Sequence, residues 1–302
     1  MMSNYAGFLL VFAAGVCWIA LGIAVSACTS RNWNYNVIQG VSFTGASLIC
    51  AVILAVKTPF AGIGTLWEMA FLMSCLAGMG NFYTYVLVSR AMKSGPNGLV
   101  WGIMQAGMIG SFLMGTLIFG EKAALLPLLG LALILSGVFA MGSAKKRSSQ
   151  ITQKGWLLPA MGAFSLLFIC HCLNALPSFF PDWSGNTPSV RTLGMNFGGL
   201  VGFLITTLPG MIHKKNYGTR NEWITGVILT LINTAASVLF FYNGLDLLAR
   251  NGRAGLGYPV AIGVCVTGFS LYSLLVLKEK YTPFSLAGLS AVCIGIIVIS
   301  LR

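Results

Sequence analysis

The chain has 302 residues, of which 57% are hydrophobic and only 8% are charged, and its formal net charge is +12. A soluble globular protein carries roughly 25% charged residues, so this composition excludes an ordinary soluble protein, and its hydrophobicity excludes a disordered one. Eight scattered cysteines in so long a chain exclude a disulfide-stapled scaffold. The basic residues lie between apolar runs, so the charge does not indicate a nucleic-acid partner. The composition predicts an all-α membrane protein.

A membrane-spanning helix needs about 20 consecutive, mostly apolar residues. Ten runs meet this requirement, and we predict one transmembrane helix in each: 6–27, 37–56, 67–88, 98–119, 123–141, 155–176, 193–212, 223–247, 255–277 and 284–301. The first run lacks a basic region and a small-residue cleavage site, so we interpret it as a retained span. Trp67, Trp156 and Trp223 open their runs and are expected at the membrane interface.

Basic residues are distributed unevenly between the two sides of this predicted bundle. The loops after the odd-numbered runs contain 12 Lys and Arg residues. The opposite side contains 6, namely Lys57, Lys122, Arg191, Arg250, Arg253 and Arg302. Cytoplasmic loops carry an excess of Lys and Arg, so we expect both termini outside and the basic segment 145–154 in the cytoplasm. The expected location is a bacterial inner (plasma) membrane, with the chain crossing it many times.

An internal repeat with an offset of 157 residues relates the two halves of the chain. Tyr85 matches Tyr242, and Trp101 falls opposite Tyr258. Further matches, some after one inserted residue, are Gly95 with Gly252, Gly98 with Gly255, Gly110 with Gly268, Glu121-Lys122 with Glu279-Lys280, Gly130 with Gly288, and Gly137 with Gly295. The predicted units are 1–144 and 155–302, joined by the linker 145–154. Because each unit has an odd number of spans, the second must insert upside down, which gives two inverted five-helix repeats.

Three segments resemble members of a known superfamily. They are the turn Gly95-Pro96-Asn97-Gly98, the sequence FGEKAALLPLLGLALILSGVFAM, and its second copy LKEKYTPFSLAGLSAVCIGIIVIS. They resemble the drug/metabolite transporter superfamily of EamA-like ten-helix transporters, in which each half ends in a Gly-Glu-type turn. The second copy departs from this pattern, because Lys278 replaces the glycine. Residues 80–92 are similar to the third span of rhamnose- and sugar-type members. The resemblance implies a secondary transporter with a central cavity.

Polar side chains inside a membrane are costly and tend to face the bundle interior or a water-filled cavity. The candidates for substrate binding are therefore Trp18, Asn81, Tyr85, Trp101, Gln105, His171, Asn174, Tyr242, Asn243 and Tyr258. Asn196 is a further polar residue inside a run. Amides offer hydrogen-bond donors and acceptors, and aromatic rings offer flat apolar contact. Because fixed charge is absent deep in the runs, the pattern favours a sugar-like or amino-acid-like solute.

Structural alternatives remain open for several of these residues. An interfacial aromatic belt also explains Trp101 and Tyr258, and hydrogen bonds between helices also explain Asn81 and Gln105. His171 is either a substrate or proton contact or a packing histidine.

Coupling to an ion gradient usually requires an intramembrane carboxylate or histidine. The candidates are His171 and Asp246, with the coupling ion, proton or sodium, left open. For Asp246 the alternative is an ion pair with Arg250, four residues later on the same helix. Glu121 and Glu279 are expected to be structural or gating residues.

Motifs of enzyme chemistry are absent from the sequence. It contains no GxxxxGK[ST] loop, and its six acidic residues are scattered. Side chains at Cys170 and Cys172 would point to nearly opposite sides of a helix, so we predict no metal site there. We expect no catalytic residues and no cofactor; the partners are a small-molecule substrate and the lipid bilayer, and the chain acts as a monomer. The predicted function is transport by alternating access between the repeats. The alternative is a non-transporting membrane protein, such as a sensor or lipid-handling enzyme.

Overall fold

The computed structural model describes residues 2–31, 33–57, 67–94, 97–122, 124–144, 155–180, 186–215, 217–276 and 282–300. Every regular element in these ranges is helical. The α-helices are α1 (Met2–Arg31), α2 (Tyr35–Lys57), α3 (Trp67–Ser94), α4 (Asn97–Gln105), α5 (Ile109–Leu117), α6 (Leu125–Ala144), α7 (Leu157–Ala175), α8 (Pro188–Thr206), α9 (Leu208–Lys214), α10 (Arg220–Ala235), α11 (Tyr242–Ala249), α12 (Gly257–Leu275) and α13 (Pro283–Ser300). The linker 145–154 and the Glu279-Lys280 pair lie outside the described residues.

Short irregular helices connect some of these elements. The 3₁₀ turns are η2 (Ala106–Met108), η4 (Leu176–Phe179) and η6 (Ala254–Leu256), and η5 (Ala236–Phe241) is a π-helix. The predicted run 98–119 is therefore two α-helices joined by η2, and the run 223–247 passes through η5. Such irregular turns change which side chains face a neighbouring helix without ending the span.

Most of the helices have the length and composition of membrane spans. Seven helical stretches of the described chain are long and apolar enough to cross a bilayer, or eight if α8 and α9, which are bent by 42° relative to each other, form one span. Two further apolar helices, Leu125–Ala140 and Pro283–Ile299, are shorter. The protein is thus an all-helical chain with the character of a multi-pass integral membrane protein.

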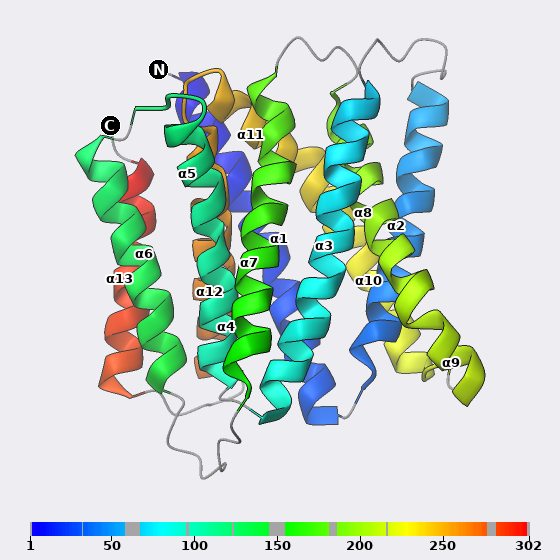
Figure 1. Cartoon of the computed structure of the whole chain (residues 1–302). Coiled ribbons are helices and arrows are strands. Elements are labelled where there is room, and N and C mark those ends of the chain that lie inside the picture. Colours follow the sequence, from blue (N-terminus) through cyan, green and yellow to red (C-terminus); the bar gives the residue numbers. More distant parts are fainter. Residues whose placement is uncertain are drawn as a thin grey trace.

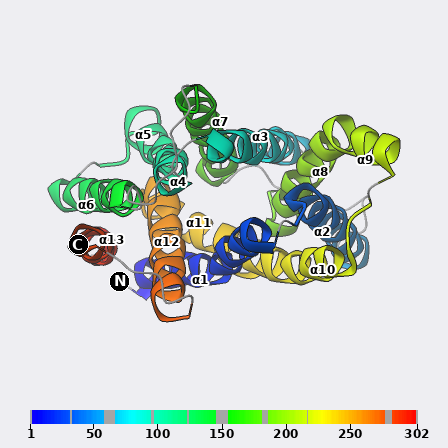
Figure 2. The same ribbon diagram turned by 90° about the horizontal axis from the view of Figure 1, so that it is seen from below.

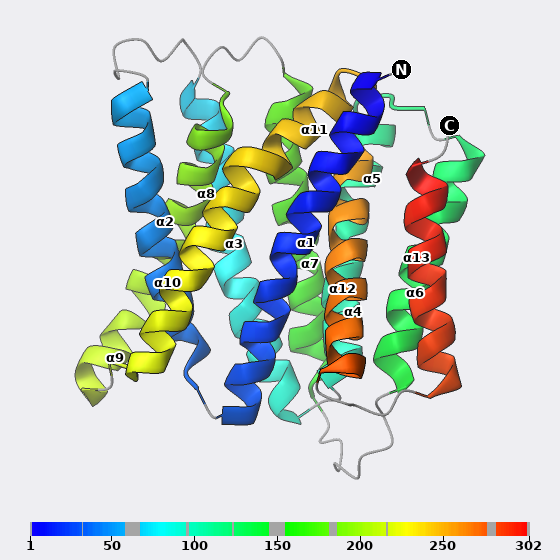
Figure 3. The ribbon, with the colours of Figure 1, turned by 180° about the vertical axis from the view of Figure 1, so that it is seen from behind.

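The helices stand side by side and alternate in direction along the chain (Figure 1). The start of α1 and the end of α13 lie at the same face, which we call the terminal face (Figure 1). An end-on view shows α6 and α13 at one end of the bundle and α2, α8, α9 and α10 at the other (Figure 2). From behind, α10, η5 and α11 form one inclined rod that runs beside α1 (Figure 3).

Glycines let pairs of helices approach each other backbone to backbone. A Cβ atom on Gly137 of α6 would lie 2.4 Å from the carbonyl oxygen of Gly288 on α13, and one on Gly130 would lie 2.8 Å from that of Gly295. Helices α3 and α8 also pack closely, because a Cβ atom on Gly198 would lie 1.8 Å from the carbonyl oxygen of Cys75. Small residues at such contacts are typical of helix packing in membranes.

The N-terminus of α8 lies earlier than the predicted start at residue 193. Pro188 is at the first position of the helix, and the Thr187 side chain accepts a hydrogen bond from the backbone N–H of Val190. Both features are typical of a helix start. Arg191 therefore belongs to the first turn of α8 and is not a loop residue, as the loop count had assumed.

Candidate functional site

A cavity of about 160 Å³ lies among the described helices. Its walls come from α1, α2, α3 and α4 in the first predicted repeat, and from α7, α8, α10, η5, α11 and α12 in the second. An engineered apolar cavity of roughly 150 Å³ holds a benzene molecule. The space therefore suits a solute about as large as a single ring.

Nine of the ten predicted binding residues line this cavity: Trp18, Asn81, Tyr85, Trp101, Gln105, His171, Asn174, Tyr242 and Tyr258. The two aromatic pairs related by the sequence repeat, Tyr85 with Tyr242 and Trp101 with Tyr258, are all among them. Trp101 and Tyr258 thus lie at the cavity, where the binding interpretation expects them. Asn196 of α8 lines it as well.

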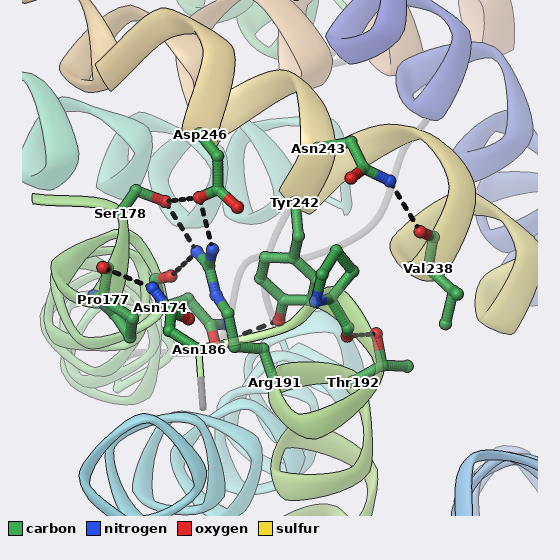
Figure 4. Close-up of polar contacts among 11 residues, drawn as sticks. Asn174, Pro177, Ser178, Asn186, Arg191, Thr192, Val238, Tyr242, Asn243 and Asp246 are labelled. Atoms are coloured by element: carbon green, nitrogen blue, oxygen red, sulfur yellow. Dashed lines mark hydrogen bonds and ion pairs between the residues drawn. The ribbon is translucent and has the colours of Figure 1, made fainter. Parts of the chain in front are cut away.

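Asn243 is the exception and does not reach the cavity. Its side chain is exposed, and its Nδ2 donates hydrogen bonds to the carbonyl oxygens of Val238 at 2.9 Å and Leu239 at 3.1 Å. Figure 4 shows this amide directed away from Tyr242. Tyr242 lines the cavity, whereas the Asn243 side chain is exposed outside it. Asn243 instead satisfies backbone groups in the π-helical η5.

Sequence reasoning missed several lining residues, three of them in the rod formed by α10, η5 and α11. Asn233 and Ser237 line the cavity four residues apart, followed by Phe241. Their helical spacing was a usable signal, because residues at i and i+4 share a face. Phe43, Met104 and Met195 also line it, but nothing in their apolar type distinguishes them from lipid-facing or core residues.

Aromatic rings form a continuous wall on one side of the cavity. The His171 ring stacks on Tyr258, with centroids 4.0 Å apart and planes inclined by 25°. Phe241 contacts Tyr258 at 4.7 Å and Trp18 at 4.8 Å. Nδ1 of His171 is buried and has no hydrogen-bond partner within the described part of the chain. A buried polar atom without a partner is costly, so this nitrogen is available to a bound solute.

The amide groups of Asn174 and Asn196 in the cavity wall already form hydrogen bonds with neighbouring residues. Asn174 donates from Nδ2 to the Met195 sulfur at 3.1 Å and accepts from the Tyr242 hydroxyl at 3.3 Å. Asn196 donates from Nδ2 to the carbonyl oxygen of Thr192 at 2.8 Å. The oxygen Oδ1 and the second hydrogen of Nδ2 are left, so Asn196 can accept a hydrogen bond from a solute or donate one to it.

A buried ion pair lies next to the cavity, where the sequence predicted no such pair. Arg191 is fully buried, and its Nη1 lies 2.8 Å from Oδ1 of Asp246. The predicted pairing of Asp246 with Arg250 is wrong, because Arg250 is exposed and the Asp246 carboxylate is bound by Arg191 and Ser178 instead (Figure 4). The i+4 rule considers one helix only, whereas a buried guanidinium must find an acceptor wherever the fold places one.

The charged groups stay outside the cavity itself. No charged side chain appears among its described lining residues, and Arg191 is separated from the cavity by Tyr242, whose ring centroid lies 4.1 Å from the guanidinium carbon. Within the described ranges no group of three His, Cys, Asp or Glu residues is placed to hold a metal ion.

Glu121 connects the two predicted repeats at the terminal face. Its carboxylate accepts hydrogen bonds from the backbone N–H groups of Ala254 at 2.6 Å and Gly255 at 3.0 Å, where the second half turns into α12. Burial raises the pKa of Glu121, while these two hydrogen bonds lower it. An acidic group at a helix N-terminus is a stabilising cap.

Comparisons with known proteins show the fold alone. No protein-family model matches this chain, and no curated protein matches it. The chain is similar to a protein of known crystal structure, with a TM-score of 0.71 and 14% sequence identity over 98% of each chain. This similarity over the full length shows a shared fold and carries no statement about activity.

Proposed function

We propose that this protein is a secondary transporter of the drug/metabolite transporter type, which moves a small uncharged solute by alternating access. The observation that supports this best is the central cavity, which is lined by residues of both predicted repeats. A site at the interface of inverted repeats is the usual arrangement in secondary transporters. The rival interpretation, a non-transporting membrane protein, predicts a dry interface between the halves.

The glycine contacts between α6 and α13 support the inverted repeat. The sequence repeat matches Gly130 with Gly288 and Gly137 with Gly295. In space Gly130 lies against Gly295, and Gly137 against Gly288. This exchange of partners is what a twofold axis between two copies produces, because residue i contacts j′ and residue j contacts i′.

The helix neighbours support the same symmetry. Helix α3 contacts α8, and the corresponding contact in the other repeat is that of α10 with α2. Helix α3 also contacts α7, and the corresponding contact is that of the rod (α10, η5 and α11) with α1. The contact of α1 with α12 has its counterpart in α7 with α4 and α5. We therefore propose ten spans, with α4–η2–α5, α8–α9 and α10–η5–α11 each forming one irregular span.

We further propose that both termini lie outside. The loops after the odd-numbered predicted spans carry 12 Lys and Arg residues, against 6 on the opposite side, and cytoplasmic loops carry the excess of basic residues.

The lining favours a neutral, hydroxyl-bearing solute over a zwitterion. An amino-acid-like solute would bring an ammonium and a carboxylate into a site whose described lining offers no opposite charge, and burying unpaired charges is expensive. A sugar-like solute can stack one face on the aromatic wall and donate its hydroxyl groups to His171 and Asn196.

Reconstitution in liposomes tests this function. We expect saturable uptake of at least one member of a pooled set of labelled neutral metabolites, together with a shift of the melting temperature on its binding. Replacing Asn81 or Gln105 with alanine should weaken uptake, whereas Ser136→Ala on the exposed side of α6 should not. If no solute shifts the melting temperature and none is taken up in either direction, the non-transporting alternative holds.

A further inference from the structure

The two ends of the cavity differ in exposure, although the repeat relates them. Tyr242 and Tyr258 are 3% and 4% exposed, whereas their repeat partners Tyr85 and Trp101 are only partly buried. Residues related by a twofold axis would be equally exposed in a symmetric state. Helix α11, which carries Tyr242, lies toward the terminal face (Figure 1). The cavity is thus closed at the end of Tyr242 and Tyr258 and more open at the end of Tyr85 and Trp101.

The closed end is fastened by the buried ion pair. Arg191 of α8 binds Asp246 of α11 through Nη1 at 2.8 Å. Its Nη2 donates to the carbonyl oxygen of Asn174 on α7 at 2.8 Å and to the hydroxyl of Ser178 on η4 at 2.9 Å. Ser178 in turn donates to Asp246 at 2.7 Å (Figure 4). One guanidinium therefore ties together three helices that surround this end of the cavity.

The ion pair lies directly behind the cavity wall. The guanidinium carbon of Arg191 is 4.1 Å from the ring centroid of Tyr242, and the Tyr242 hydroxyl bonds to Asn174. Both Tyr242 and Asn174 line the cavity, whereas Arg191 does not. Any path from the cavity to the terminal face between α11 and α8 must therefore separate Asp246 from Arg191.

The open end has no equivalent ion pair between side chains. The repeat offset of 157 places Ser89 opposite Asp246, because 246 minus 157 is 89, and Asn34 opposite Arg191, because 191 minus 157 is 34. The buried carboxylate of Glu222 accepts only backbone N–H groups there, from Asn34 and Thr219. The pair is also suited to opening. The Asp246 side chain is 28% exposed and can be hydrated, and Nε of Arg191 is buried without a partner among the described residues. A buried ion pair gains little net stability over its hydrated ions, so it can exchange between two states.

We propose that Arg191 and Asp246, with Ser178, form a latch that holds the cavity closed toward the terminal face and opens when the transporter switches sides. This proposal rests on the transport function proposed above, because only a cavity that alternates between two faces needs a separable closure. Arg191 and Asp246 act as positioning residues, since neither lines the cavity.

A native cysteine provides the test. Cys265 of α12 lines the cavity, so its labelling reports from which face the cavity can be entered. A protein that keeps Cys265 and replaces the other seven cysteines with alanine is reconstituted, and a C-terminal tag scores its orientation. A membrane-impermeant maleimide is then added at either face. When Arg191, Asp246 and Ser178 are unchanged, we expect Cys265 to be labelled from the face opposite the termini.

Asp246→Asn should raise the labelling rate from the terminal face by about tenfold, the effect of shifting the closed-to-open equilibrium by tenfold. Ser178→Ala, which introduces no unpaired charge, should raise the labelling rate from the terminal face by a smaller factor. This variant tests the latch if Asp246→Asn does not fold. Arg250→Gln, at an exposed position on the turn after the same helix, is the matched control and should change nothing.

The latch is rejected if folded Asp246→Asn and Ser178→Ala proteins are labelled from the terminal face no faster than the Arg250→Gln control. This result is distinct from failure of the transport function. If no tested solute is taken up but labelling of Cys265 still changes sides, the cavity alternates and the latch holds, and only the proposed class of solute is rejected. Normal uptake with unchanged labelling would reject the latch alone.

Discussion

Oε2 of Glu121 lies 3.0 Å from the backbone nitrogen of Gly255, a residue 134 positions later in the chain. Oε1 binds the preceding N–H, so one carboxylate satisfies two donors that the start of η6 and α12 leaves free. Glu121→Ala should lower the free energy of unfolding by about 1–2 kcal/mol, the usual effect of removing a helix cap. Thermal unfolding in detergent measures it, with exposed Lys122→Ala as the control.

The same carboxyl group predicts a pH dependence of stability. Burial raises the pKa of Glu121 above its ordinary value of 4.5, so the folded protein binds the proton more tightly than the unfolded chain does. The resulting stabilisation is complete below pH 4.5 and is lost as the pH rises through the raised pKa. The difference in melting temperature between the wild type and Glu121→Gln should therefore shift in favour of the variant over this range. A difference that is constant with pH would contradict the prediction.

Substituting His171 should weaken transport much more than it changes stability. His171→Phe keeps a ring against Tyr258 and removes the buried nitrogen that has no partner in the described structure. The variant also loses a hydrogen bond between the imidazole ring and the Gly107 backbone. We therefore expect little net change in thermal stability, with solute affinity about tenfold lower from the loss of one hydrogen bond to the solute. Tyr258→Phe, which keeps the stacked rings, is the control for packing. Equal losses of stability and uptake would show that His171 only packs.

The contact between α6 and α13 should tolerate no side chain. Gly137→Ala would place a methyl group 2.4 Å from the carbonyl oxygen of Gly288, and we expect it to destabilise the protein. Overpacking of this kind costs about 1–3 kcal/mol. Gly210→Ala on α9 is a matched control, because nothing lies within 4 Å of the added atom. Chemical unfolding in mixed micelles should separate the two variants clearly.

Asn243 should be a stability residue and not a binding residue. Asn243→Ala removes hydrogen bonds to two carbonyl oxygens of η5, at Val238 and Leu239. Each such bond contributes about 0.5–1.5 kcal/mol, so the melting temperature should fall. Uptake by the folded fraction should persist with an unchanged KM, since the side chain is exposed outside the cavity. A large increase in KM at normal stability would contradict this assignment.

The cavity residues were predictable because polarity is costly in a membrane. Asn81, Gln105 and Asn174 could be recognised from the sequence as polar groups that require a polar or wet environment, and each lines the cavity. Asn243 is equally polar, but its requirement is met by the π-helical turn beside it. Periodicity assumes a regular helix and does not reveal such a turn.

The ion pair of Arg191 and Asp246, by contrast, could not be predicted from the sequence. Arg191 lies at the edge of an apolar run, and charge near an edge is normally read as a loop or interfacial residue. Its partner Asp246 is 55 residues away in the chain. Spacing along a single helix identifies partners three or four residues apart, so this pair could be found only from the fold.

The backbone contact between α6 and α13 has a consequence for how the protein is made. α6 ends at Ala144 and α13 begins at Pro283, so 138 residues (283 − 144 − 1) are synthesised between the two partners. The first predicted repeat therefore leaves the ribosome with one glycine face of α6 uncovered until α13 has been made. Unlike a chain of domains that fold in order of synthesis, this bundle cannot complete the contact of α6 until α13 inserts.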